Sequence, residues 1–358
     1  MPVNFYDKEK HTAVDAKFEA QKIAFAPFVF QAAVALRDLG ILEAIEKQGD
    51  AGIRLTDLAE ALPLSHYGIK ILVEAGLGMG LLLLKENKYS LTNTGYFILH
   101  DAMTRVNMDF VRDVNYQGFF HLKEAIQTGK PAGLKVFGNW PTFYQAFTAL
   151  PPEVQKSWLA FDHFYSDAAF EDVLPLVFKE KPRKLLDVGG NTGKWALQCM
   201  RYDANVHVMI ADLPGQLRMA ERNIGKEGFG ERMTYHAIDL LNPSEKLPSG
   251  HNAIWMSQFL DCFSQQEIIS ILKRTADAME GEDRLYILET YWDRQKFKAA
   301  AFCLQQTSLY FACLANGNSQ MYHSEDMKAC LEAAGMKVVE ETDNLGISHT
   351  LFKCIKKQ

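Results

Sequence analysis

The sequence predicts an α/β fold in which a Rossmann-like seven-stranded sheet follows a mostly helical, winged-helix-like N-terminal domain. Three observations support this prediction. Closely spaced glycines follow a short apolar run near residue 190, as they do at a strand-to-helix turn. Further apolar runs alternate with helical patterns from there toward the C-terminus. Short helical patterns and two runs typical of a hairpin occupy the first hundred residues.

One glycine-rich loop is central to the prediction. Residues 183–188 form an apolar run after Pro182 and predict a buried strand. The glycines that follow let the backbone turn tightly and approach a ligand without Cβ collisions. We expect the next helix to begin near the last of them. They are Gly189, Gly190 and Gly193.

The spacing and charge of this loop indicate its ligand. The positions that would need the second and third glycines of the dinucleotide pattern hold Asn191 and Lys194. Asp187 ends the strand, where its negative charge would repel a pyrophosphate but would suit an ammonium and a sulfonium. S-adenosylmethionine carries both groups. On the loop alone, a glycine-rich turn of some other α/β protein remains the alternative.

Carboxylates at the ends of the next two strands favour the same ligand. The run 205–211 ends in Asp212, roughly 20 residues past the loop, where a carboxylate can accept hydrogen bonds from both ribose hydroxyls. We therefore expect Asp187 and Asp212 to act as a pair. A third strand, 233–238, ends in Asp239, which could accept from the adenine amino group.

The remaining elements complete a mixed sheet. Ser264 begins a capping box, Ser-Gln-Gln-Glu, that opens a helix over residues 265–278. Because ligands in open α/β sheets bind beyond the carboxyl ends of the strands, we expect these ends and residues 257–261 to converge on one crevice. The other expected strands are 252–257, 283–289, 337–341 and 350–355, and the other expected helices are 297–315 and 324–334.

Composition excludes several classes of function. A chain of 358 residues with 48% hydrophobic content can form two cores. A net charge of −6 offers no polybasic field for nucleic acid or membrane. The apolar stretch 23–36 is interrupted by Pro27 and is shorter than the roughly 20 residues of a membrane span, so we expect a core or interface helix. The first twenty residues lack a signal-peptide core, which favours the cytoplasm. The six scattered cysteines have no zinc spacing, so no metal is expected.

The N-terminal pattern is typical of a winged helix. Helices are expected over 36–46, from an N-cap at Thr56, and from an N-cap at Ser65, followed by strands 81–84 and 89–92. A winged helix raises the possibility of DNA binding and transcriptional regulation. The presumed recognition helix offers only one lysine and one glutamate, which is too little charge to neutralise several phosphates.

Four runs carry a resemblance to a known family: L-L-D-V-G-G-N-T-G, A-D-L-P, I-D-L-L-N-P and M-S-Q-F-L-D-C-F-S-Q-Q-E. They resemble the class I methyltransferases, specifically the O-methyltransferase family of plant phenolic and bacterial polyketide enzymes. The resemblance extends from about Ala24 to the C-terminus. It implies S-adenosylmethionine as the cofactor and a small aromatic or polyketide-like hydroxyl compound as the substrate.

The resemblance also implies the organisation of the chain. Residues 1–104 would form a dimerisation domain whose apolar N-terminal helices interlock in a homodimer, with no nucleic-acid or membrane partner. Residues 105–180 would form a helical connector that contributes to the substrate pocket. Residues 181–358 would bind the cofactor, with contacts from Asp187, Gly189, Gly190, Gly193, Asp212, Leu213, Asp239, Leu240, Ser257 and Gln258.

Candidates for the substrate pocket and catalysis are less specific. The segment 161–167 resembles the family helix just before the cofactor loop, which makes His163, Phe164 and Tyr165 pocket candidates, together with Trp140 and Met321. For each, an ordinary packed aromatic or surface histidine is an equally good interpretation.

The chain departs from the family pattern at the catalytic positions. The family histidine that deprotonates the substrate aligns with Asp261, and its supporting glutamate aligns with Met321. Asn191 replaces a usual glycine, and Ser257 a frequent lysine. One hypothesis is therefore an O-methyltransferase whose base is Asp261, His163 or His323. A second is a cofactor-binding relative with lost or redirected chemistry, and a third is a transcriptional regulator. Asp261 could also act only to stabilise the positive N-terminal end of the following helix.

Overall fold

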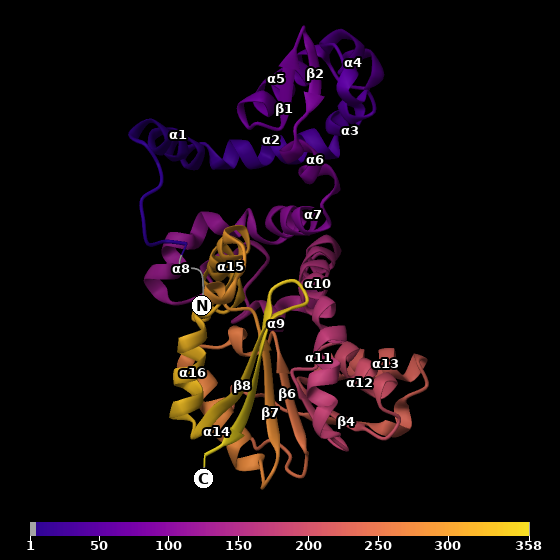
Figure 1. The fold of residues 1–358 in the computed structure, drawn as a ribbon, viewed down its shortest axis with the longest axis vertical. Helices are drawn as coiled ribbons and strands as arrows, with labels where there is room; N and C mark the ends of the chain where they lie inside the picture. The colour runs from indigo at the N-terminus through magenta and orange to yellow at the C-terminus, as the bar shows by residue number, and fades with distance from the viewer. Residues whose placement is uncertain (1–4, 358) are drawn as a thin grey trace. The chain divides into compact units, whose positions relative to one another are not determined.

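The computed structural model describes residues 5–357 (Figure 1). The chain forms two compact units, one from Tyr6 to Asp113 and the other from Val114 onward. The division lies beyond the boundary expected after residue 104, because helix α7 (Ala102–Asp109) belongs to the first unit.

The first unit packs helices around a two-stranded antiparallel hairpin, as expected for a winged helix. The hairpin turn consists of Glu86 and Asn87, both with positive φ, which is typical of a tight turn that matches strand twist. The elements are α1 (Ala13–Ala24), α2 (Ala26–Asp38), α3 (Ile41–Glu46), α4 (Leu55–Ala61), α5 (His66–Gly78), β1 (Leu82–Lys85), β2 (Lys88–Leu91), α6 (Asn93–His100) and α7.

Three details of this unit differ from the prediction. The stretch 23–36 is divided between α1 and α2, since Pro27 lies in the first turn of α2 and has no N–H to continue α1. The expected helix 36–46 is broken at Gly40, whose φ of +74° suits glycine. Thr56 is not an N-cap, because α4 already begins at Leu55. The cap at Ser65 is confirmed, since its hydroxyl accepts from Gly68 N.

The second unit contains the predicted seven-stranded mixed sheet, with strand order β5-β4-β3-β6-β7-β9-β8. The strands from β5 to β7 are parallel, and β9 pairs antiparallel with both β7 and β8. The bounds are β3 (Lys184–Val188), β4 (His207–Asp212), β5 (Met233–Ala237), β6 (Ala253–Ser257), β7 (Arg284–Glu289), β8 (Met336–Leu345) and β9 (His349–Lys356).

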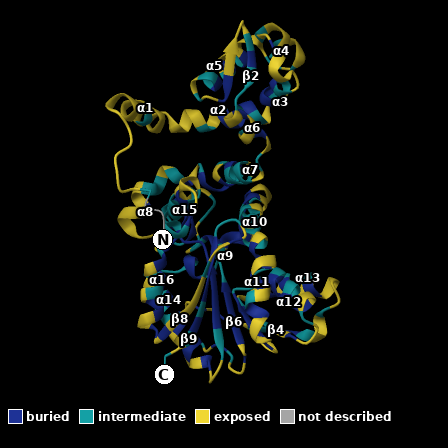
Figure 2. Ribbon diagram, in the orientation of Figure 1, coloured by how far each residue is buried: buried dark blue, intermediate teal, exposed yellow. Residues whose placement is uncertain are grey.

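Helices cover both faces of this sheet (Figures 1 and 2), which explains why the central strands are buried along nearly their whole length. The bounds are α8 (Leu122–Thr128), α9 (Phe143–Ala146), α10 (Pro152–Ser166), α11 (Phe170–Val177), α12 (Lys194–Tyr202), α13 (Pro214–Lys226), α14 (Gln265–Ala278), α15 (Lys298–Tyr310) and α16 (Ser324–Ala333).

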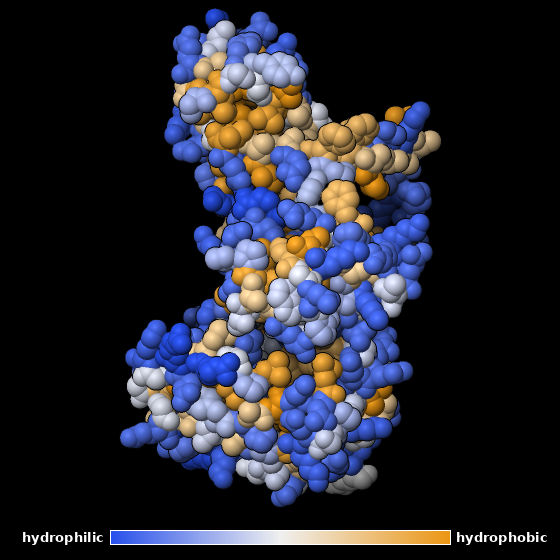
Figure 3. Space-filling model, turned by 180° about the vertical axis from the view of Figure 1, so that it is seen from behind, coloured by the Kyte–Doolittle hydropathy of each residue, from blue (hydrophilic) through white to orange (hydrophobic). Residues whose placement is uncertain are grey.

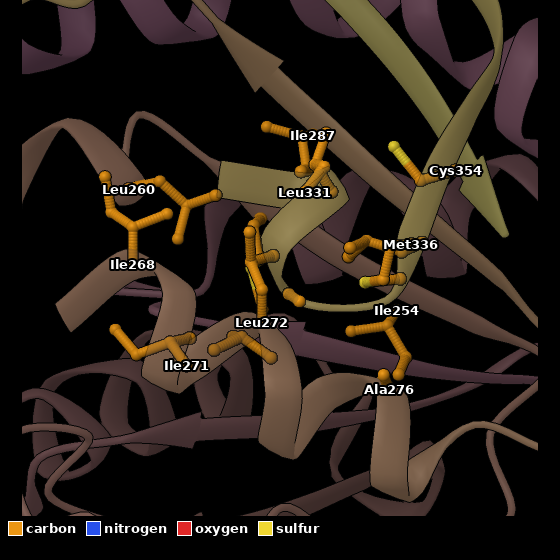
Figure 4. Close-up of a cluster of buried hydrophobic side chains, with 14 of the residues drawn as sticks. Ile254, Leu260, Ile268, Ile271, Leu272, Ala276, Ile287, Leu331, Met336 and Cys354 are labelled. Atoms are coloured by element: carbon orange, nitrogen blue, oxygen red, sulfur yellow. The ribbon is translucent and has the colours of Figure 1, made fainter. Parts of the chain in front are cut away.

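The two faces have separate hydrophobic cores. On one face, Ile254 and Ile287 of the sheet pack with Leu272 of α14 and Leu331 of α16 (Figure 4). On the other, side chains of α11, α12 and α13 pack against the sheet around Trp255. This arrangement leaves the carboxyl ends of the parallel strands as the edge at which loops can form a site. Among the helices of the described residues, none is both long and apolar enough to cross a membrane.

The capping box of α14 supports a test of this architecture. The Ser264 hydroxyl accepts from Glu267 N, and the Glu267 carboxylate accepts from Ser264 N at 2.8 Å. We expect Ser264→Ala to lower the free energy of unfolding by about 1 kcal/mol, the usual cost of losing such a cap. Urea unfolding of the full chain measures the change. Ser270→Ala, within the same helix, is the matched control and should leave stability unchanged or slightly raised. Equal losses in both variants would contradict the cap assignment.

Candidate active site

The glycine-rich loop after β3 has the backbone expected of a ligand cradle. Gly189 has φ +74°, Asn191 has φ +48°, and Gly193, the N-cap of α12, has φ +80°. A Cβ at Gly189 would lie 2.2 Å from the Phe259 ring, and one at Gly193 would lie 2.7 Å from Ile224. Only glycine fits at these two positions, whereas asparagine tolerates the left-handed backbone at the third.

Asp187 is a buried carboxylate beneath this loop. It is only 2% exposed, and its Oδ2 atom has no hydrogen-bond partner within residues 5–357. A Cβ at Gly190 would lie 2.8 Å from that oxygen, so the loop backbone passes directly over it. Burial, assisted by the charge of Asp212, raises the pKa of Asp187 to about 8. An unpaired buried carboxylate is costly, and a cationic ligand would compensate it.

Asp212 joins the end of β4 to the same loop. Its carboxylate accepts from Asn191 N at 2.9 Å and from Leu213 N at 2.7 Å. Burial raises the pKa of Asp212 to about 6, although both hydrogen bonds act to lower it. Asp187 and Asp212 therefore lie on either side of the loop, as their positions at the ends of two adjacent strands predicted.

Helix α10 and the turn after it cover the loop. Lys194 Nζ lies 2.5 Å from Asp167, and Asn191 Nδ2 donates to Asp162 at 3.4 Å. His163 Nδ1 lies 3.7 Å from Asp167. The cavity between loop and helix is small, about 80 Å³. Residues that line it include Asp162, His163, Asp187, Gly189, Gly190, Ser257 and Gln258, with Trp195 and Trp255 stacked at 4.1 Å.

The structure does not bring every predicted cofactor residue to this cavity. The Ser257 hydroxyl is buried at its wall without a hydrogen-bond partner among the described residues. Gly193 and Asp212 adjoin the loop, but neither lines the cavity. Asp239 is exposed, and its carboxylate accepts from Leu241 N. Leu240 belongs to the hydrophobic core and Leu213 is exposed.

Asp261 lies in the short helix Leu260–Cys262 that follows β6, and it is 5% exposed. Cys262 Sγ donates to its Oδ1 at 3.4 Å. Burial raises the pKa of Asp261 to about 7, to which the nearby Asp162 contributes. The N-cap of α14 is Ser264 rather than Asp261.

Two further carboxylates were missed by the sequence analysis. Glu289, at the end of β7, is 2% exposed and accepts from Phe259 N and Leu260 N at 3.0 and 2.9 Å. Burial and the neighbouring Asp261 raise its pKa well above the usual value. Glu289 could have been found by the rule that selected Asp187, since it also ends a parallel strand. Asp162 lies within a stretch of helical pattern and not at the end of a strand, so this rule could not have selected it.

The other pocket candidates lie outside this cavity. Tyr165 is buried against Phe161 and Phe164, with ring centroids 5.1 and 5.5 Å away. Met321 is buried and lies 3.6 Å from the Thr290 hydroxyl. Trp140 packs over Gly138. His323 is the N-cap of α16 and accepts from Glu325 N.

Comparison with known proteins places this geometry in a family. The chain matches the Dimerisation2-like domain over residues 17–89 and the O-methyltransferase domain over residues 119–337. It is 25% identical to a bacteriochlorophyllide d C-20 methyltransferase of Chlorobaculum tepidum, over 63% of this chain and 65% of that protein. It is 24% identical to the aclacinomycin 10-hydroxylase RdmB of Streptomyces purpurascens, over 53% of this chain and 50% of that protein. Each match spans less than two thirds of the relative's length.

The fold extends over nearly the whole chain of a solved relative. The apo S-adenosylmethionine-dependent methyltransferase SibL superposes with a TM-score of 0.72 at 23% identity, covering 95% of this chain and 99% of that one. This likeness concerns the fold alone. Because the family model matches well over half of the sequence, the chain belongs to the O-methyltransferase domain family.

Proposed function

We propose that the protein is an S-adenosylmethionine-dependent methyltransferase that modifies a hydroxyl group of a small aromatic or polyketide-like molecule. The observation that carries the proposal is the buried Asp187 carboxylate, whose Oδ2 atom has no partner among the described residues and lies directly beneath the loop backbone at Gly190. Membership of the O-methyltransferase domain family supports a hydroxyl acceptor, and the name of the Chlorobaculum relative, a C-20 methyltransferase, supports methyl transfer in general.

The residues around the loop fit the cofactor's chemistry. Asp187 would compensate the positive charge of its amino-acid part, and Asp212 would accept from the ribose hydroxyls. Gly189 and Gly190 leave room for close approach, and Ser257 offers an unused hydroxyl. When bound, S-adenosylmethionine supplies an electrophilic methyl group. The proposed cofactor contacts also include Gly193, Leu213, Asp239 and Leu240. The connector over residues 105–180 would contribute to the substrate pocket, whose proposed residues are Trp140, Phe164, Tyr165 and Met321.

Asp261 is our candidate for the proton acceptor. An aspartate at its usual pKa near 4 is a poor base for a phenol, but burial raises the pKa of Asp261 to about 7 and so improves the match. Glu289 holds the backbone immediately before this position by accepting from Phe259 N and Leu260 N. His163, which lines the cavity beside Asp167, is the second candidate.

One observation favours a second function. The family histidine position holds Asp261, and RdmB, a relative that also matches this chain, is named as a hydroxylase rather than a methyltransferase. The cofactor site could therefore serve a redirected reaction. A product assay by mass spectrometry separates the two, since methyl transfer adds one methyl group to the substrate and converts S-adenosylmethionine to S-adenosylhomocysteine, whereas hydroxylation adds an oxygen atom.

Assembly as a homodimer, in the cytoplasm, completes the proposal. Within the first unit, α1, α2 and the residue between them expose Phe18, Ile23, Phe25 and Phe28, of which Ile23 is 76% and Phe28 73% exposed. Figure 3 shows hydrophobic surface along the segment that carries these helices. Large apolar side chains on one face are typical of an interface, and the match to a Dimerisation2-like domain covers the same segment. Six cysteines without a disulfide partner suit a reducing compartment.

The first prediction from the proposed function concerns the cofactor and the pH dependence of its binding. Calorimetry should show S-adenosylhomocysteine binding in the micromolar range and no binding of NADH. A bound ammonium favours ionised Asp187, whose pKa in the free protein is about 8, so binding releases a proton below that pH. Affinity should therefore rise with pH between about 6.5 and 8, by up to tenfold per unit, and then level off.

Asp187→Asn should bind more weakly and lose most of this slope, because the amide cannot titrate. Asp203→Asn, at the half-buried C-cap of α12, is the control and should keep both affinity and slope. Binding of NADH without S-adenosylhomocysteine would refute the proposed function, and a flat pH profile in the unaltered protein would refute the role of Asp187.

The second prediction concerns Asp261. Because the amide in Asp261→Asn cannot accept a proton, we expect turnover of an identified substrate to fall at least tenfold, while S-adenosylhomocysteine affinity stays within about twofold. The kcat and the calorimetric affinity should be measured on the same preparation of each protein. Unchanged turnover would exclude Asp261 as the base and transfer that role to His163, which His163→Gln would test.

The third prediction concerns assembly. Light scattering at micromolar concentration should report about twice the 40.5 kDa chain mass. Phe28→Glu would place a charge in the interface and should give monomer or aggregate. Lys47→Glu, on a polar surface of the same unit, is the control and should remain dimeric. A monomer in the unaltered protein would contradict the dimer.

A further inference from the structure

Gln258 has an unusual backbone at the edge of the cavity. It directly follows β6 and has φ +44°, a left-handed conformation that residues other than glycine rarely adopt. Its N–H donates to Leu288 O at 3.0 Å, which ties the position to the neighbouring strand β7. Its side chain lines the cavity together with Asp187 and Gly189. Strained backbone of this kind is concentrated at functional sites.

His349 contacts Gln258 from outside the cavity. It is the first residue of β9, is fully buried, and does not line the cavity. Its Nε2 atom lies 3.3 Å from Gln258 Oε1. Burial lowers the pKa of His349 to about 4, so the ring is neutral near pH 7 and carries one N–H. Because an amide oxygen can only accept, a hydrogen bond at this contact requires that N–H to be on Nε2. The acceptor end of the amide is thereby engaged away from the ligand.

The hairpin that carries His349 is fixed on a second side of the site. Gly346, at its tip, donates through its N–H to Asp172 Oδ2 at 2.8 Å. A Cβ at Gly346 would lie 2.7 Å from Ala169 N, so the tip packs against the turn between α10 and α11. That turn also carries Asp167, the partner of Lys194 at the start of α12, directly after the glycine-rich loop. The hairpin therefore contacts both the cover of the cavity and Gln258 at its wall.

Resting on the proposed function, we propose that His349 is a positioning residue for the cofactor. It holds the Gln258 amide oxygen outside the cavity and so leaves the amide N–H groups for an acceptor atom of the bound ligand, such as the carboxylate of S-adenosylmethionine. His349 itself touches neither the cofactor nor the reacting atoms. It fixes the rotation of the Gln258 amide before the ligand binds, so that this conformational entropy is not lost on binding.

Two variants of His349 separate positioning from packing. His349→Phe keeps a ring of similar size but has no donor, and should weaken S-adenosylhomocysteine binding about tenfold by calorimetry. His349→Gln restores a donor and should recover affinity to within about threefold. In turnover assays His349→Phe should raise KM for S-adenosylmethionine and leave kcat within about twofold. His251→Phe is the matched control: His251 is also buried, but it precedes β6 at the opposite end of the strand, and its loss should leave the affinity unchanged.

A double-mutant cycle tests the route through Gln258. Gln258→Leu should weaken binding about tenfold, and adding His349→Phe should weaken it by no more than about twofold further, because the contact is already lost. Gln258→Glu leaves His349 intact and still accepts its hydrogen bond, yet has no N–H to offer, so it should bind as weakly as Gln258→Leu. This variant keeps the test valid if His349→Phe fails to fold.

The outcomes distinguish this inference from the proposed function. If the unaltered protein does not bind S-adenosylhomocysteine, the proposed function fails and this inference with it. If the protein binds but His349→Phe has full affinity, the inference alone fails. The inference would also be overturned if the affinity losses of His349→Phe and Gln258→Leu multiplied in the double variant. The same holds if His251→Phe lost as much affinity as His349→Phe, or if Gln258→Glu kept full affinity.

Discussion

The contact between the Gly189 backbone and the Phe259 ring is the constraint on which the site depends. No side chain fits at Gly189, since a Cβ would lie 2.2 Å from the ring, so the loop after β3 and the loop after β6 are locked against one another. Glu289 secures the second loop through Phe259 N and Leu260 N. Asp261 follows directly, which means that its position relative to the glycine-rich loop is set by backbone contacts and not by its own flexible side chain.

Buried carboxylates at this edge of the sheet lower the stability of the unliganded protein. The pKa values of Asp187, Asp261 and Glu289 are all raised, chiefly by burial, so each favours the protonated form in the folded chain. The unfolded chain releases these protons at the ordinary carboxyl pKa, whereas the folded chain retains them. The free energy of unfolding therefore decreases as the pH rises from the ordinary carboxyl pKa toward the raised values. A fold that keeps such groups where apolar residues would pack is more readily explained by ligand binding than by stability.

The sheet and the backbone of the glycine-rich loop were predicted well because both depend on local patterns. Glycines with no room for a Cβ, carboxylates at strand ends and the Ser264 capping box are encoded within a few residues each. The errors at Gly40, Pro27 and Thr56 are errors of helix boundaries, where neighbouring caps compete. Asp162 and His349 were missed for a different reason: the proximity of Asp162 to Asp261, and of His349 to Gln258, arises from packing between segments far apart in the chain, which periodicity does not report.

The pairing of β9 has a consequence for synthesis of the chain. This strand lies between β7 and β8 in the sheet, and His349 and Gly346 at its start contact the cavity wall and the cover over the loop. These residues come after every other strand of the sheet in chain order. Folding during translation proceeds from the N-terminus, so the first unit and the strands up to β7 can begin to fold before β9 has been made, whereas the wall of the cavity can be completed only once β9 is present. A chain interrupted before β9 would therefore lack the contact of His349 with Gln258.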